Sequence, residues 1–268
     1  MPDEPGVVAR RAACFARPPQ VLAVSGRDVA VAQPLPPERP AEPPAGAVAL
    51  MAPVAGAGSH PAGGGTAGIT VVAEHGTVTA EILGLEVARV VPGPAGEWRL
   101  EVGVGRYDRE ARAEMFPGED TVAALDQAAA EVAAKRRPGL AAHPANTLVK
   151  ERWLRAVVVA RPDLVGAAHL EARPTARPRR DLSVAEPAPA VGVLTDGTPV
   201  TVVCSTGVDL DLVPTAAELR QRDAAGSRLL LAVPAGDDYP VTRRLAAALA
   251  EPAEVVAVPS DWARRYPE

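Results

Sequence analysis

The residues with the clearest chemical potential stand directly after an apolar run in the last third of the chain. Cys204 and Ser205 follow residues 200–203, which are all Val or Thr, and nucleophiles are often displayed where a buried strand ends. Such a nucleophile needs an oriented base. No histidine follows His169, which excludes the hydrolase order of serine, acid and histidine, so His143 or His169 could serve only if folding brought it to the strand end. A small buried strand residue is the simpler interpretation of Cys204, and an enzyme that uses Cys204 or Ser205 is the alternative.

A second group of candidate side chains is acidic. Asp209 and Asp211 alternate with apolar residues, which places both carboxylates on one face if the segment is extended, and Glu218 follows. Three such groups could bind a hard cation, although a solvated strand face that leads into a helix cap is the simpler interpretation. The histidines and cysteines show no spacing typical of a zinc site. We therefore expect no metal site and no cofactor.

Arginines gather in a proline-broken stretch before the last third of the chain. The candidate nucleic-acid contacts are Arg173, Arg177, Arg179 and Arg180, because arginines in a loop can bind phosphates. No aromatic residue is interleaved with them to stack on bases. A solvated basic loop is therefore the alternative interpretation.

Composition and charge limit the classes of function. The 268 residues carry a net charge of −5, which argues against strong non-specific binding to nucleic acid but is compatible with a local basic groove. Cys14 and Cys204 are far apart in the sequence, which favours reduced thiols over a disulfide scaffold. The N-terminus is acidic and proline-broken, unlike a signal peptide, and the apolar stretch at 45–58 is too short to span a bilayer. These features predict a cytoplasmic protein without membrane association.

The N-terminal part of the chain has the pattern of a β-rich domain. Residues 20–32 predict a hairpin around a Gly-containing turn. Prolines and glycines crowd residues 34–68, where we expect a long loop or linker. Short strands separated by turn residues are predicted at 69–72, 78–83, 85–91 and 98–104. We therefore predict a β-rich domain over residues 1–106, through which a homodimer could form.

The rest of the chain alternates between helical and strand patterns. A helix from Asp120 to the basic run before Pro138 makes residues 107–146 a helical connector. Residues 147–268 are predicted as an α/β domain with a helix at 147–160, a hairpin joining 191–194 to 200–204, a helix at 214–222 opened by a capping box, a strand at 229–233, a helix at 238–250 and a strand at 255–258. The final strand–helix–strand order indicates a βαβ unit. The predicted fold class is α/β, or α+β for the whole chain.

Three features of this predicted C-terminal domain match a known pattern. They are the stretch Glu151-Arg152-Trp153-Leu154 with Pro162-Asp163-Leu164 after it, the Asp196-Gly197 hairpin into the strand at 200–203, and the closing strand–helix–strand. In order and spacing they resemble the core of the PD-(D/E)XK nuclease superfamily, and the endonuclease NucS and RecB-like families in particular. NucS also places a β-rich domain in front of this core. The resemblance implies a restriction-endonuclease-like α/β domain that acts on DNA.

The sequence departs from that superfamily at its catalytic positions. The resemblance implies an acid on the first hairpin strand and Glu-x-Lys on the next, because two carboxylates hold Mg²⁺ and the lysine positions the attacking water. Here the two strands read Val191-Gly192-Val193-Leu194 and Val203-Cys204-Ser205-Thr206. Of the acidic set Glu151 remains, Asp181 or Glu186 could substitute from the preceding loop, and nothing replaces the lysine.

These departures lead us to expect a catalytically degenerate, nuclease-like protein that binds nucleic acid or a protein partner. Two alternatives stay open: the strand-end enzyme, and an active metal-dependent DNA endonuclease with migrated acidic ligands. The candidate catalytic residues are accordingly Glu151, Asp181, Cys204 and Ser205.

Overall fold

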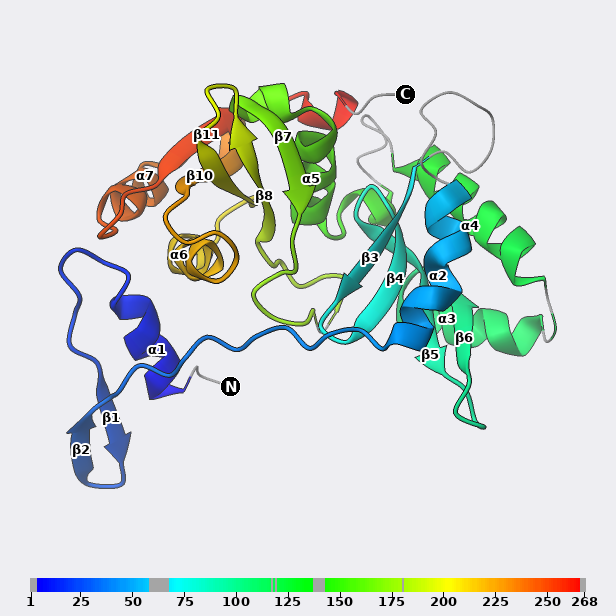
Figure 1. Cartoon of the computed structure of the whole chain (residues 1–268), viewed down its shortest axis with the longest axis horizontal. Coiled ribbons are helices and arrows are strands. Elements are labelled where there is room, and N and C mark those ends of the chain that lie inside the picture. Colours follow the sequence, from blue (N-terminus) through cyan, green and yellow to red (C-terminus); the bar gives the residue numbers. More distant parts are fainter. Residues whose placement is uncertain are drawn as a thin grey trace. The chain divides into compact units, whose positions relative to one another are not determined.

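The structure, a computed structural model, describes residues 4–57, 68–116, 118, 120–136, 143–179 and 181–265. It is a mixed α/β protein with several sheets, as the sequence predicts (Figure 1). The chain divides into two compact units. The first contains Met1–Arg39, Pro162–Ala176 and Pro187–Ser260, and the second contains Pro40–Arg161, Arg177–Glu186 and Asp261–Glu268. Because the units interleave along the sequence, the predicted domain boundaries at residues 106 and 146 do not coincide with this division.

The first unit is built on a five-stranded mixed sheet with the strand order β11-β10-β9-β8-β7. Its strands are β7 (Ala167–Ala172), β8 (Ala188–Leu194), β9 (Pro199–Cys204), β10 (Arg228–Pro234) and β11 (Glu254–Val258). The first three are antiparallel neighbours, and β10 and β11 continue parallel to β9. The predicted hairpin and the predicted βαβ unit are confirmed, whereas β7 was not predicted.

Three helices accompany this sheet: α1 (Pro5–Ala12), α6 (Leu212–Asp223) and α7 (Pro240–Ala247). Ala216 of α6 and Ala246 of α7 share one buried apolar cluster with Val203 of β9 and Leu231 of β10. Both crossover helices therefore cover the same face of the sheet. The predicted N-terminal hairpin is also confirmed, as β1 (Leu22–Ser25) and β2 (Asp28–Val31).

Two local predictions in the first unit need correction. Helix α1 was not predicted, although Pro5 at its first position suits a helix start. Helix α6 begins at Leu212 rather than at residue 214, so the expected capping box around Thr215 is wrong. Thr215 lies inside the helix, where its hydroxyl accepts a hydrogen bond from Arg11 of α1 (3.4 Å).

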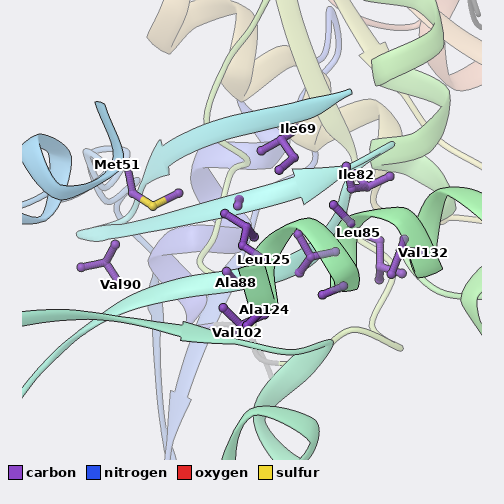
Figure 2. Close-up of a cluster of buried hydrophobic side chains, with 14 of the residues drawn as sticks. Met51, Ile69, Ile82, Leu85, Ala88, Val90, Val102, Ala124, Leu125 and Val132 are labelled. Carbon is purple, nitrogen blue, oxygen red and sulfur yellow. The ribbon is translucent and has the colours of Figure 1, made fainter. Parts of the chain in front are cut away.

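The second unit is built on a four-stranded antiparallel sheet in the order β3-β4-β5-β6. Its strands are β3 (Ile69–Glu74), β4 (Thr77–Ile82), β5 (Leu85–Pro92) and β6 (Trp98–Val102), which confirms the four predicted strands. Figure 2 shows the apolar side chains of these strands packed with Met51 of α2 (Ala45–Ala57) and Leu125 of α4 (Thr121–Lys135). The opposite face of the sheet carries the charged residues of β4 and β5.

Helix α2 replaces part of the loop that was expected over residues 34–68. Its prolines and glycines misled the prediction, but Ala47 and Met51 lie one helical turn apart and are fully buried against the sheet. A Cβ at Gly46 would come within 2.7 Å of the Trp98 ring, so the glycine permits close packing on β6. Residues 58–67 of the expected loop lie outside the described residues.

Helices α3 (Gly105–Met115), α4 and α5 (Lys150–Ala160) complete the second unit. The helix predicted from Asp120 is confirmed as α4, and the Asp120 side chain caps it by accepting from the N–H of Val122 (2.9 Å). The helix predicted at 147–160 is confirmed as α5 but begins at Lys150, because Val149 has a left-handed backbone (φ 43°).

Helix α5 was expected to belong to the C-terminal domain at 147–268. It belongs instead to the second unit. Its Arg152 backbone lies against the turn between β4 and β5, where a Cβ at Gly84 would come within 2.6 Å of the Arg152 carbonyl carbon. Trp153 packs edge-to-face on Trp262 of the same unit, with ring centroids 5.4 Å apart. Long-range packing therefore assigns this helix to the sheet that precedes it in the sequence.

Candidate functional site

Cys204 and Ser205 stand at the end of β9, but the structure buries both. Cys204 is fully buried, and Ser205 is 1% exposed. The Ser205 N–H donates to the Ala232 carbonyl at 3.1 Å, so this residue extends the ladder between β9 and β10. Among the described residues the Ser205 hydroxyl has no hydrogen-bond partner. This burial favours a structural role for both side chains.

The histidines do not supply a base for these two residues within the first unit. His169 lies on β7, which β8 separates from β9, and its Nε2 atom faces Glu171 at 3.5 Å on the exposed surface. His143 belongs to the second unit. Within the described part of the first unit, His169 is therefore not a base for Cys204 or Ser205.

The acids expected from the nuclease resemblance are not assembled in either unit. Glu151 is buried on α5 in the second unit, whereas the hairpin strands β8 and β9 belong to the first. Asp181 is exposed and accepts hydrogen bonds from the backbone N–H (2.7 Å) and hydroxyl (2.8 Å) of Ser183. These two bonds hold the pKa of the Asp181 carboxyl below its usual value.

The acidic group after β9 also differs from the expected arrangement. Residues 205–211 form no strand, and the Asp209 carboxylate accepts from the Asp211 N–H at 2.9 Å. Glu218 is held by Arg10 (2.7 Å) and Arg11 (3.5 Å) of α1. Across the described residues, no three His, Cys, Asp or Glu side chains are placed to hold a metal ion.

The predicted basic cluster is divided between the two units. Arg173 belongs to the first unit, where its guanidinium lies 3.4 Å from Glu171. Arg177 and Arg179 belong to the second, and Arg177 is exposed. Arg180 lies outside the described residues. These arginines therefore do not form one basic surface within a single unit.

Arg179 is turned inward rather than toward solvent. Its Nη1 atom is buried and has no hydrogen-bond partner in the described residues. Burial lowers the pKa of this guanidinium, while the nearby carboxylates of Glu81 and Glu86 act in the opposite direction. Arg179 thus belongs to a buried charged layer on the sheet of the second unit.

A hollow of about 240 Å³ lies in the second unit, along the outer edge of β6. We call it the β6–α3 pocket. It is lined by four consecutive residues of β6, by one face of α3 and by the first turn of α4. The lining residues include Arg99, Leu100 and Glu101 of β6, Arg109 and Arg112 of α3, and Thr121 and Ala124 of α4.

Two carboxylates, Glu86 and Glu101, bind arginines at or beside the β6–α3 pocket. Glu101 lies 2.7 Å from Arg99 Nη2 and 3.8 Å from Arg109 Nε. Glu86, on the neighbouring strand β5, binds Arg109 Nη1 and also Arg89 Nη2, the latter at 2.7 Å. Arg109 therefore joins the pocket to the charged face of the sheet and is fixed at one end.

Arg112 also lines the pocket, and its guanidinium lies over the ring of Phe116, 5.9 Å from the centroid. Three arginines (Arg99, Arg109 and Arg112) and one carboxylate (Glu101) thus line the pocket, and Glu86 binds Arg109 from the neighbouring strand. Arg109 is 7% exposed, and within the described residues its Nε–H has no hydrogen-bond acceptor. A buried donor without an acceptor is costly, so a ligand oxygen there would be stabilising.

The start of α4 contributes little of this positive field. The backbone N–H groups of Val122 and Ala123 already donate to the Asp120 carboxylate, at 2.9 and 3.5 Å. The helix N-terminus is therefore satisfied by its own cap. The charge that could attract a ligand comes from the arginines.

Sequence reasoning missed the β6–α3 pocket, although one signal was present. Arg109, Arg112 and Phe116 are spaced by three and then four residues, which places them on one face of a helix. The sequence pattern predicts only a helical connector over residues 107–146. The approach of this face to β6 depends on the tight turn at Gly103 and Gly105, both of which have positive φ.

No helix within the described residues is long and apolar enough to cross a membrane. Comparison of the chain with protein-family models, with curated proteins and with solved structures found no match.

Proposed function

We propose that the protein acts by binding an anionic ligand in the β6–α3 pocket. The observation that carries this proposal is the group of three arginines, Arg99, Arg109 and Arg112, that lines a hollow of about 240 Å³ together with one carboxylate, Glu101. Guanidinium groups bind phosphate and carboxylate with two parallel hydrogen bonds. The volume suits a small phosphorylated or carboxylated molecule, or the anionic part of a larger ligand.

The arginines are partly organised before a ligand arrives. Glu86 fixes one end of Arg109 from inside the sheet, and Glu101 lies 3.8 Å from its Nε. A ligand anion would thus meet a guanidinium whose rotamer is already restricted, which lowers the entropy cost of binding. Arg112, stacked on Phe116, lies at the pocket from the next turn of α3.

A binding role is favoured over catalysis by the placement of the candidate nucleophiles. Cys204 and Ser205 are buried, and His169 stands two strands away from them. A nucleophile must reach its substrate and needs an oriented base, and His169 does not provide that base. The polar groups that do converge on a hollow are arginines, which bind anions but do not abstract protons at neutral pH.

Calorimetric titration of the full chain with inorganic phosphate and with citrate tests this proposal. Binding should be weakened by salt, and Arg112→Gln should weaken it by about tenfold, because one charged hydrogen-bonding group is removed. Arg228→Gln is the matched control, since Arg228 is an exposed arginine of the first unit paired with Glu254 at 2.6 Å. Equal affinities of the wild type and Arg112→Gln for both anions would refute the proposal.

A nuclease-like protein that binds DNA is a second proposal. It is supported by the resemblance of the C-terminal pattern and by the antiparallel order β7-β8-β9 that leads into parallel β10 and β11. A gel-shift assay with single-stranded and duplex DNA, at two salt concentrations, tests it. Loss of binding in Arg173→Gln and Arg177→Gln would support this role, and DNA binding that ignores both changes would contradict it.

A further inference from the structure

The β6–α3 pocket runs along the free edge of a strand. In the sheet formed by the described residues, β6 pairs with β5 on one side and is an edge strand on the other. The Gly103 N–H donates to the Val87 carbonyl, and the Gly93 N–H donates to the Glu97 carbonyl. Both bonds fit the register that pairs Leu100 with Val90. They show which residues of β6 direct their backbone groups toward β5.

Hydrogen-bonded and non-bonded pairs alternate along an antiparallel ladder. The backbones of residues 97 and 103 form hydrogen bonds with β5. Arg99 and Glu101 each lie two residues from one of these positions, so their backbone groups also face β5. Trp98, Leu100 and Val102 therefore direct their N–H and C=O groups away from β5. Within the described residues, no backbone hydrogen bond to the Leu100 N–H or C=O closes this edge.

The two walls of the pocket differ in chemistry. The α3 side carries Arg109 and Arg112, together with Arg99 from β6. The α4 side carries Ala124, and Leu100 points to the apolar cluster on that side. Because successive side chains of a strand point to opposite sides, a strand lying in the pocket would meet arginines and an apolar wall in alternation.

We propose that the ligand of the β6–α3 pocket is an extended peptide segment of a partner protein, with alternating acidic and apolar side chains, that adds as a strand to β6. This inference rests on the proposed anion-binding function and names the class of ligand. The backbone of the peptide pairs with the outward groups of Leu100 and its neighbours, and its carboxylates bind the α3 arginines. A compact anion would engage the arginines and leave the strand edge unpaired.

The experiment uses the full chain and two fluorescein-labelled, blocked pentapeptides of identical composition. One has the order Val-Glu-Val-Glu-Val, and the other has the order Glu-Glu-Val-Val-Val. Fluorescence anisotropy should show that the alternating peptide binds about tenfold tighter, because only this order directs both carboxylates to α3. Inorganic phosphate should displace the bound alternating peptide, since both occupy the arginines.

Backbone pairing is tested by methylating each peptide nitrogen of the alternating peptide in turn. In an added strand every second N–H bonds to β6 and the others face away. The affinity should therefore fall by about tenfold at every second position and change little between them. This series leaves the protein unaltered, so it remains informative if a protein variant fails to fold.

Two protein variants complete the test. Leu100→Pro removes the outward N–H of β6 at a position where an edge strand tolerates proline, and it should weaken peptide binding more than phosphate binding. Arg112→Gln should weaken both. The outcomes separate the two proposals: phosphate binding with equal affinity for both peptides, or with a uniform effect of methylation, overturns strand addition alone. Binding of neither phosphate nor peptide overturns the anion-binding function as well.

Discussion

Glu81 of β4 and Glu86 of β5 are directly opposite each other in the sheet of the second unit, and each is only 2% exposed. Like charges in this position repel each other, and the surrounding arginines offset that repulsion. Arg152 of α5 binds Glu81 at 2.6 Å and also binds Glu74, while Arg109 and Arg89 bind Glu86. The protonation of Glu81 is therefore linked to the stability of the second unit.

The stability of the second unit should depend on pH through Glu81. Burial raises the pKa of the Glu81 carboxyl from 4.5 to about 7, Glu86 adds to this shift, and Arg155, Arg179 and Arg136 oppose it. Between these two values the folded chain keeps a proton that the unfolded chain releases. The free energy of unfolding should thus fall as pH rises from 4.5 to 7, by at most about 3 kcal/mol.

Urea unfolding followed by tryptophan fluorescence measures this effect, because all three tryptophans lie in the second unit. Glu81→Gln, which stays neutral, should remove this part of the pH dependence. A variant with the same pH profile as the wild type would show that Glu81 does not titrate in this range.

Arg136 should be essential for the stability of the second unit. Its side chain is 1% exposed and lies over the ring of Trp153, 4.6 Å from the centroid. It donates to four backbone carbonyls, those of Leu83, Ala145, Leu148 and Val149. Arg136→Ala would leave these carbonyls without their donor and should lower the free energy of unfolding by about 3 kcal/mol.

The control for Arg136 is Arg106→Ala, which removes an exposed arginine paired with Glu110 on α3 (2.7 Å). Exposed ion pairs contribute little, so this change should stay within about 0.5 kcal/mol of the wild type. Similar losses in the two variants, measured by urea unfolding, would contradict the role assigned to Arg136.

The reactivity of the two thiols should report on different parts of the first unit. Cys14 follows α1 and is buried, and burial raises the pKa of its thiol. Glu218 of α6 holds Arg10 and Arg11 of α1, so Glu218→Ala should free this helix and speed labelling of Cys14 by about tenfold or more. Labelling of Cys204 should remain slow in both proteins.

Mass spectrometry of alkylated protein at neutral pH separates the two cysteines. Glu254→Ala, at an exposed carboxylate of the same unit, should leave both rates unchanged. Rapid alkylation of Cys204 in the native wild type would instead support the strand-end enzyme and weaken the binding proposal.

Nuclease activity should be absent in the presence of Mg²⁺ or Mn²⁺. The hairpin strands β8 and β9 lack the acid, Glu and Lys that the resemblance requires, and Glu151 belongs to the other unit. A cleavage assay on single-stranded and branched DNA measures this. Metal-dependent cutting that Glu151→Ala abolishes would restore the active-endonuclease alternative.

Local patterns predicted most strands of this protein. β3 to β6 and the hairpin β8–β9 are short β-prone runs between turn signals, and each is confirmed. Helix α2 was missed because Pro53 lies inside it and composition suggested a loop. Its stability comes from burial of Ala47 and Met51, which depends on a sheet formed later in the sequence.

The candidate site was harder to predict because it depends on contacts between distant segments. Ser205 was found by its place after an apolar strand, but its burial depends on the fold around it. In the sequence, nothing distinguishes Arg109 from other arginines of a predicted helical segment. Its role in the pocket depends on Glu86 of β5 and Glu101 of β6, whose carboxylates lie near its guanidinium. Patterns in a single sequence do not specify such pairings.

The Nε–H of Arg109 reports whether the β6–α3 pocket binds anions. NMR spectra of ¹⁵N-arginine-labelled protein, assigned with Arg109→Lys, would be recorded during titration with inorganic phosphate. Because this buried donor has no acceptor among the described residues, its signal should shift with saturation while that of Arg228 stays in place. An unchanged Arg109 signal, or parallel shifts of all exposed arginines without saturation, would contradict anion binding in this pocket.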